Sequence, residues 1–266
     1  MGGNPLLSCP NSKRLEKAFG ELEETNTALE DTNVKLEHLA TTDALTGLSN
    51  RHSMEDSFLR EIARCEKDGH PVSLITKSTM VLRDLDLLAE MGNRNLCSVA
   101  MSVTTLDDEL KRRLEPRTAS PNARLRAIKE LASAGVRVDL MVAPVIPSIN
   151  DHEIEDILAA GKEAGATAAN YIFLRLPLEI GPLFRDWLQQ HYPDRASHVM
   201  SIVQQSRGGK DYQPAFYTRM AAEGVFADII GKRFRVAARK LGLTRDDRFR
   251  LDTSQFSKPI QQLSLF

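Results

Sequence analysis

The stretch from Val136 to Glu153 constrains the fold of this chain more than any other. It begins with a run of β-branched and apolar residues and then passes Pro144 and Pro147, which the middle of a strand or helix does not accommodate. It ends at an Asn-Asp pair of the kind that starts helices. The stretch therefore predicts a buried parallel strand whose carboxyl end becomes a loop.

The same unit recurs on both sides of this stretch. Residues Cys97 to Thr105 and Asn170 to Pro177 have the composition of strands, and Asn122 to Ala134 has a helical period. Strands that alternate with helices predict an α/β protein with a parallel sheet. Ligands of such sheets bind at the carboxyl ends of the strands, so the first candidate residues are Lys77, Thr104, Thr105, Ile146 and Arg175.

Asn150-Asp-His-Glu153 could be chemical, because it contains an Asp-His pair, but a local interpretation is favoured. Asn150 or Asp151 is expected to cap the helix that runs to Gly165. Glu153 then lies in the first turn, where the helix dipole favours a carboxylate.

Composition excludes several classes of protein. The chain has 266 residues, 42% of them hydrophobic, and a net charge of -1, so bulk charge does not direct it to nucleic acid or anionic membrane. No apolar run approaches the roughly 20 residues of a membrane span, and the N-terminus has no signal-peptide core. These features predict a cytoplasmic protein that does not associate with membranes.

The cysteines predict no metal site. Cys9, Cys65 and Cys97 are too far apart for a zinc or iron-sulfur spacing motif, and an odd number suits a reducing compartment. The three cysteines are therefore expected to be unrelated thiols.

Residues 1–40 form a leader followed by a heptad pattern. Leu15, Leu22, Leu29 and Leu36 are seven residues apart, and Phe19, Asn26 and Asn33 make the companion row. Leucine at one core position with asparagine at the other favours a parallel two-stranded coiled coil, and therefore a homodimer. The alternative is a single amphipathic helix that packs on its own domain.

Residues 41–75 resemble the start of a known family. Asp43-Ala-Leu-Thr-Gly-Leu-Ser-Asn-Arg51 is similar to the opening of a diguanylate cyclase (GGDEF) domain, and the resemblance extends from Leu15 to Ile75. No Gly-Gly-Asp/Glu-Glu-Phe motif follows, and Arg207-Gly-Gly-Lys-Asp211 lies in a different context. Without that turn a cyclase has no means of holding GTP and metal, so this segment is interpreted as a fragment.

From Thr76 onward the chain resembles another family. Seven blocks carry the resemblance, and the first of them runs from Thr76 to Gly92. The other six are Ser102-Val-Thr-Thr-Leu-Asp, Leu114-Glu-Pro-Arg, Val142-Ala-Pro-Val-Ile-Pro, Asn150-Asp-His-Glu, Leu174-Arg-Leu-Pro and Arg207-Gly-Gly-Lys-Asp-Tyr. They are similar, in this order, to radical SAM proteins related to spore photoproduct lyase.

The resemblance implies a partial β/α barrel that is incomplete in this chain. Members of that family have six strands and a four-iron four-sulfur cluster on a C-x3-C-x2-C loop after the first strand. Residues 76–178 would supply the last four strands, whereas the first two strands and the three cluster cysteines have no counterpart in this sequence. The region 179–252 is expected to be helical, with Leu178 to His191, Ala196 to Gln205 and Ala221 to Leu241 as helices.

The resemblance also assigns roles around S-adenosylmethionine. Lys77 would meet the methionine carboxylate, Ser102 and Thr104 would face the ribose, and the backbone at Val145 and Ile146 would face the adenine. Each residue has a simpler alternative: a solvated lysine, hydroxyls satisfied within the sheet, and prolines that only end a strand.

Two further segments predict contacts with phosphate groups, of a substrate in one case and of nucleic acid in the other. Backbone donors and positive charge in the turn Arg207, Gly208, Gly209 and Lys210 suit a phosphate, although a solvated glycine turn explains the same residues. The last helix is basic, which suits a phosphate-contacting face or simple solvation; its basic residues are Lys232, Arg233, Arg235, Arg239 and Lys240.

Residues 253–266 are predicted to be a flexible tail with a binding motif. The ending Gln262-Leu-Ser-Leu-Phe266 resembles the pentapeptide by which bacterial DNA polymerases and repair proteins hold the sliding clamp. Leu265 and Phe266 would fill a pocket on the clamp, Leu263 would add to the contact, and Gln262 would bond at its rim. Alternatively, the tail folds back onto the protein's own core.

These observations give one leading function and two alternatives. The parent activity would be reductive cleavage of S-adenosylmethionine, with a nucleic-acid lesion as the target, and this chain is expected to be inactive because the cluster ligands are absent. The alternatives are a dimeric signalling or interaction module and an accessory protein of the sliding clamp.

Overall fold

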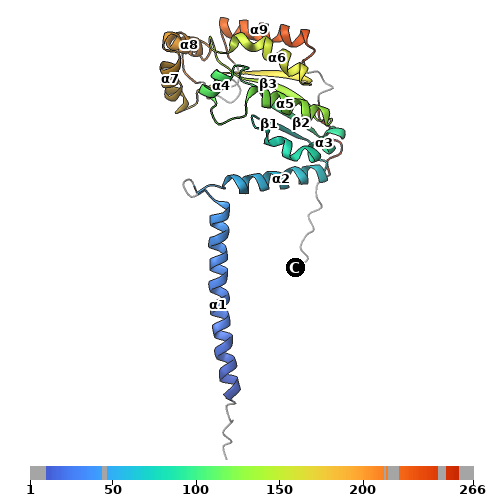
Figure 1. Cartoon of the computed structure of the whole chain (residues 1–266), viewed down its shortest axis with the longest axis vertical. Coiled ribbons are helices and arrows are strands. Elements are labelled where there is room, and N and C mark those ends of the chain that lie inside the picture. The colour runs from blue at the N-terminus through green and yellow to red at the C-terminus, as the bar shows by residue number, and fades with distance from the viewer. Residues whose placement is uncertain (1–9, 44–46, 213, 215–221, 245–249, 258–266) are drawn as a thin grey trace, which may run out of the picture. The chain divides into compact units, whose positions relative to one another are not determined.

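The computed structural model describes residues 10–43, 47–212, 214, 222–244 and 250–257. The chain divides into two compact units, residues 1–61 and residues 62–266 (Figure 1). Among the described residues, none of the helices is long and apolar enough to span a membrane.

The first unit contains helix α1 (Pro10–Thr41) and most of α2 (Arg51–Lys67). The turn between them is held by an isolated antiparallel bridge of Thr42 with Ser49. Asn50 starts α2, because its side-chain oxygen accepts the Ser53 N–H at 2.9 Å, as an N-cap does.

The second unit is built on a parallel four-stranded sheet. Its strands are β1 (Val72–Thr76), β2 (Cys97–Ser102), β3 (Arg137–Val145) and β4 (Ala168–Phe173), and their spatial order is the same as their chain order. The prediction of an α/β protein with about four parallel strands is confirmed.

Four helices cover one face of the sheet, and all but the last of them also connect its strands (Figure 1). These are α3 (Leu85–Asn93), α5 (Pro121–Ser133), α6 (Ile154–Glu163) and α9 (Val225–Lys240). The shorter elements are the 3-10 turns η1 (Thr79–Asp84) and η2 (Asp151–Glu153) and helix α4 (Asp108–Leu114). Helices α7 (Ile180–His191) and α8 (Pro193–Gln205) pack on each other.

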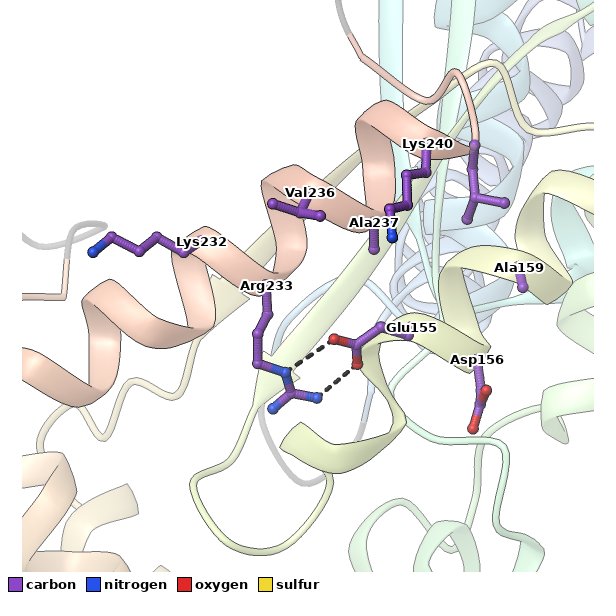
Figure 2. A pocket seen from close by; sticks show the side chains of 9 residues that line it. Glu155, Asp156, Ala159, Lys232, Arg233, Val236, Ala237 and Lys240 are labelled. Atoms are coloured by element: carbon purple, nitrogen blue, oxygen red, sulfur yellow. Dashed lines mark hydrogen bonds and ion pairs between the residues drawn. The ribbon is translucent and has the colours of Figure 1, made fainter.

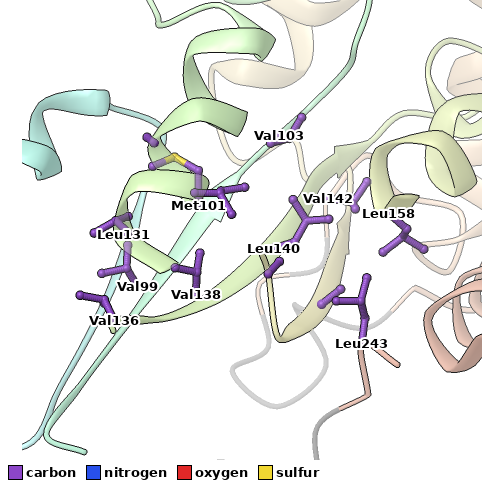
Figure 3. Packing of buried hydrophobic residues seen from close by; sticks show 14 of the residues in the cluster. Val99, Met101, Val103, Leu131, Val136, Val138, Leu140, Val142, Leu158 and Leu243 are labelled. Atoms are coloured by element: carbon purple, nitrogen blue, oxygen red, sulfur yellow. The ribbon is translucent and has the colours of Figure 1, made fainter. Parts of the chain in front are cut away.

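Alternation along the strands makes two different faces. Every second residue, such as Val99, Met101 and Leu140, packs under the helices in the main hydrophobic core (Figure 3). Most of the residues between them are small or polar, with Ile75 and Met141 among the exceptions, and Ser98 and Asp139 are polar examples that are buried. The face away from the helices is therefore suited to polar ligands rather than to a second apolar layer.

A second core lies beyond the carboxyl ends of the strands. Helices α7 and α8 contribute most of it, and the loops after β3 and β4 add Ile146, Ile149, Leu174 and Leu176. This core fixes the loops that surround the candidate site.

Some predicted boundaries differ from the structure. The strand predicted as Cys97 to Thr105 ends at Ser102, after which the chain turns out of the sheet. The boundary predicted between residues 75 and 76 falls inside β1, and Ile62 already belongs to the core of the second unit. The change in sequence character near Ile75 is thus not a break between compact units.

Candidate ligand site at the strand ends

Lys77 joins the ends of three adjacent strands. It follows β1, and its Nζ donates to Thr104 Oγ1 at 3.2 Å, to the Ala143 carbonyl oxygen at 3.3 Å and to the Glu115 carboxylate. Thr104 follows β2, and Ala143 lies near the end of β3. The Lys77 side chain is 36% exposed, so part of it faces solvent.

Glu115 lies between two cations. Its other oxygen accepts from the guanidinium of Arg124 at 2.6 Å, and Arg124 also donates to the Ser102 carbonyl oxygen at 3.0 Å. Burial opposes ionisation of Glu115, but hydrogen bonds and charge from Lys77 and Arg124 outweigh it and hold the pKa of Glu115 below its ordinary value. The cluster of Lys77, Glu115 and Arg124, hereafter the ion cluster, keeps a net positive charge.

The two hydroxyl residues assigned to the ribose are buried. Thr104 is 2% exposed, its Oγ1 donates to the Ala143 carbonyl oxygen at 2.9 Å, and Glu115 Oε1 lies 3.1 Å away. Ser102 is 4% exposed, at the end of β2. Both residues therefore lie beside the ion cluster, and the assignment of Ser102 and Thr104 to a ribose stays a prediction.

Asn150 has a different role from the predicted helix cap. It precedes η2 but makes no side-chain capping bond. Instead its Oδ1 accepts the Ile146 N–H at 2.6 Å, and its Nδ2 donates to the carbonyl oxygens of Thr104 at 2.7 Å and Pro144 at 2.9 Å. The prediction of a cap at Asn150 is wrong, because these buried backbone groups of the strand-end loops need partners.

Glu153 also binds a strand end. Its carboxylate accepts from Thr105 Oγ1 at 2.6 Å and from the Leu106 N–H at 2.7 Å, and the residue is buried. The predicted interaction with the helix dipole is therefore not the only role of Glu153. Asn150 and Glu153 together hold the loop after β2 against the loop after β3.

The shelf predicted for adenine is formed by buried residues. Val145 and Ile146 are fully buried, in the main core and the second core respectively. The Val145 carbonyl oxygen accepts the Leu174 N–H at 2.9 Å, and the Ile146 N–H is bound by Asn150. These two backbone groups already have protein partners, and the adenine contact at Val145 and Ile146 stays a prediction.

The glycine turn after α8 makes several internal bonds. Arg207 is 3% exposed and donates to the Leu174 carbonyl oxygen at 3.1 Å; burial, followed by the charge of Arg175, lowers its pKa. The Gly209 N–H donates to the Gln204 carbonyl oxygen at the end of α8, at 2.8 Å, and the Lys210 N–H donates to the Arg207 carbonyl oxygen, at 3.4 Å. Gly208 and Gly209 have φ of 64° and 83°, which explains the glycines without a phosphate.

The basic helix α9 is partly neutralised by α6. Between them lies a groove of about 630 Å³ (Figure 2). Arg233 makes two bonds to the Glu155 carboxylate, at 2.9 and 2.6 Å, and lies 3.8 Å from Asp151. The basic row of this helix is therefore not a uniform cationic face, and its contact with nucleic acid stays a prediction.

The described thiols, Cys65 and Cys97, provide no place for an iron-sulfur cluster. Cys97 is 1% exposed, its Sγ donates to the Leu88 carbonyl oxygen at 3.1 Å, and burial raises its pKa to about 11 against the opposing charge of Arg137. In the part of the chain that the structure describes, no three His, Cys, Asp or Glu side chains are grouped to hold a metal. The described residues do not fit the cluster.

Sequence reasoning missed Glu115, Arg124 and the roles of Asn150 and Glu153. Arg124 gave a usable signal, because it falls on the buried face of its helix with Ala127, Ile128 and Leu131. A charged residue on an apolar face indicates a buried partner. The only sequence signal for Glu115 was its position in the Leu114-Glu-Pro-Arg block that resembles the family.

Comparison with known proteins decides the family. Residues 25–160 match the model of the radical SAM superfamily. This chain belongs to the radical SAM superfamily.

Relatives with similar sequences extend the match. An uncharacterized protein of Mycobacterium tuberculosis is 33% identical over 193 residues, which are 72% of this chain and 54% of the relative. An uncharacterized protein of Methanocaldococcus jannaschii is 30% identical over 123 residues, which are 46% of this chain and 44% of that protein. This radical SAM chain thus spans about half the length of the curated relatives that it matches.

Solved structures support the same fold. A variant of spore photoproduct lyase with bound AdoMet and dinucleoside spore photoproduct has a TM-score of 0.50 and 18% identity, and covers 70% of this chain and 53% of that chain. Another variant of the lyase has the same values. At this identity the likeness shows the radical SAM fold alone.

Three further sequence predictions have no structural test. The clamp motif at Gln262, Leu263, Leu265 and Phe266 lies outside the described residues. The cyclase-like resemblance of residues 43–51 and the coiled-coil pairing also stay predictions.

Proposed function

We propose that this chain binds S-adenosylmethionine at the carboxyl ends of its strands and that it does not generate a radical by itself. The observation that carries the proposal is the convergence of three strand ends on Lys77, whose Nζ is anchored and whose side chain is partly exposed to solvent. In parallel α/β sheets this is the edge where ligands bind.

The charge of the ion cluster fits the carboxylate at the methionine end of the ligand. Lys77 and Arg124 carry two positive charges and Glu115 one negative charge, so a carboxylate that approaches Lys77 meets a net positive cluster. Arg124 is enclosed, which leaves Lys77 as the member that a ligand carboxylate would meet. A spore photoproduct lyase variant was solved with AdoMet bound, which supports the choice of ligand for this fold.

The cysteines are the reason for proposing that the chain does not generate a radical by itself. A four-iron cluster in this family supplies the electron that cleaves the sulfonium, and its ligands are cysteine thiolates that lie together. The sequence holds only Cys9, Cys65 and Cys97, and no C-x3-C-x2-C motif. Lesion repair, which the likeness to the lyase suggests, would therefore need cluster ligands from outside this sequence.

Equilibrium dialysis with radiolabelled S-adenosylmethionine tests the binding. The wild-type chain should bind one equivalent, and Lys77→Ala should weaken binding about tenfold or more, because it removes the cation that attracts the ligand carboxylate. Lys129→Ala, which removes an exposed lysine on α5, is the matched control and should bind as the wild type does.

A second variant separates binding from folding. Thr104→Val keeps the shape of the side chain and removes the hydroxyl beside Lys77. If both variants melt cooperatively and bind the ligand as tightly as the wild type, the ligand does not use this site and the proposal is wrong.

A further inference from the structure

We infer that two copies of this chain pair through α1 as a parallel, in-register coiled coil. The inference does not depend on the proposed SAM site, because it concerns only the first unit. It defines a surface, hereafter the heptad stripe, that consists of Phe19, Leu22, Asn26, Leu29, Asn33 and Leu36.

The heptad stripe is open to solvent in the single chain. Leu22 is 66% exposed, Leu29 is 58% exposed and Leu36 is 57% exposed. Figure 1 shows α1 as one long, continuous helix. Leucines that repeat every seven residues along such a helix form a continuous apolar seam of the kind that a second helix buries.

The composition of α1 also argues for a partner helix. It contains Gly20 and a series of residues with poor helix propensity, namely Thr25, Asn26, Thr27, Thr32 and Asn33. The threonine hydroxyls donate to backbone carbonyl oxygens four residues earlier, for example Thr25 to Glu21 at 2.6 Å. A lone helix of this composition gains little from propensity, so packing must supply most of its stability.

The asparagines select a second copy in parallel orientation. With leucine at heptad position d, Asn26 and Asn33 occupy position a. In a parallel, in-register pair each of them faces its own counterpart, and the two amides can bond to each other. In an antiparallel pair position a faces position d, and each buried amide would lie against a leucine without a partner.

The flanking charges select the same orientation independently. Position e is occupied by Glu23, Glu30 and Glu37. In a parallel pair these carboxylates lie beside position g of the other helix, which holds the uncharged residues Thr25, Thr32 and Leu39. In an antiparallel pair the e rows face each other, and carboxylate would meet carboxylate.

Sedimentation of the full-length chain tests the pairing. The wild type should be a dimer at micromolar concentration. Leu29→Ala should raise the dimer dissociation constant at least about tenfold, because the truncated leucine is buried in both copies. Val34→Ala is the matched control, because Val34 is 66% exposed on the same helix but lies outside the heptad stripe, so this variant should dimerise as the wild type does.

Disulfide trapping tests the orientation. Asn26→Cys and Asn33→Cys are made separately in a full-length background with Cys9, Cys65 and Cys97 replaced by serine. In a parallel, in-register dimer each variant should form its own intermolecular disulfide in high yield. In a symmetric antiparallel pair, only one position along the helix can lie opposite its own copy in the partner. Disulfides at both position 26 and position 33 therefore indicate a parallel pair.

Three results would overturn the inference. A monomer at tens of micromolar concentration would remove the pairing, and a trimer would remove the two-stranded assembly. Cross-linking of only one of the two cysteine variants would show a shifted or antiparallel pair.

Discussion

Glu115 determines the electrostatics of the strand ends, because both Lys77 and Arg124 depend on its carboxylate. No other acidic partner of Arg124 is recorded among the described residues, and the arginine is 2% exposed. Removal of Glu115 therefore leaves a buried guanidinium without its counter-charge, which is among the costly changes in a folded protein.

Glu115→Gln should lower the free energy of unfolding by about 3 kcal/mol at neutral pH. Because Lys77 and Arg124 hold the folded-state pKa of Glu115 below 4.5, its stabilisation is present above that pH and is lost as the pH falls through the lower, folded value. Urea unfolding of wild type and variant at several pH values should show curves that converge in acid. An equal gap at all pH values would contradict the ion cluster.

The control for this series is Glu130→Gln, an exposed acid on α5. It should change the free energy of unfolding by less than about 0.5 kcal/mol at neutral pH.

Cys97 supports a prediction about reactivity. Its thiol is buried and its pKa is raised to about 11, so at pH 8 it holds almost no thiolate. Iodoacetamide should leave Cys97 unmodified in the native protein and alkylate it after unfolding in urea, as peptide mass spectrometry would show. Rapid alkylation of Cys97 in the native protein would mean that this end of β2 is accessible to solvent.

At the scale of elements, α6 and β3 approach closely because of one glycine. A Cβ at Gly161 would lie 2.5 Å from the Leu140 side chain. Gly161→Ala should therefore destabilise the protein by about 1–3 kcal/mol through overpacking. Gly181→Ala on α7 is the matched control, because its nearest contact would be 3.6 Å, and it should cause no such loss in thermal unfolding. Equal melting temperatures would show that the α6–β3 contact is loose.

The elements also show what sequence could predict. The strands and helices were predictable because alternation and helical period are local, and β3 begins one residue after the predicted start at Val136. Asn150 and Glu153 were not, because their partners Thr104 and Thr105 lie 46 and 48 residues away. A polar residue at a helix start has the same local pattern whether it caps the helix or binds a distant loop.

The candidate site was predicted in part for the same reason. Lys77 and Thr104 could be placed at strand ends, and the structure brings them within 3.2 Å. Glu115 lies at the end of α4 and Arg124 within α5, and their meeting depends on how both helices pack on the sheet. Periodicity gives the face of a helix but not its partner across the fold.

At the scale of the whole molecule, the chain has the fold of its family but not the cysteines that the chemistry of the family requires. The chain belongs to the radical SAM superfamily and has a parallel sheet with a cationic site at its carboxyl edge. Its sequence contains three dispersed cysteines, and the buried Cys97 is a poor ligand in this fold. The account therefore separates binding of S-adenosylmethionine, which these residues suit, from its cleavage.

Anaerobic reconstitution of the full-length chain with iron and sulfide, followed by dithionite and S-adenosylmethionine, tests this separation most directly. The account predicts no stoichiometric four-iron absorbance, no 5′-deoxyadenosine by chromatography, and intact S-adenosylmethionine that Lys77→Ala retains less tightly than the wild type. A stoichiometric cluster together with 5′-deoxyadenosine would contradict it.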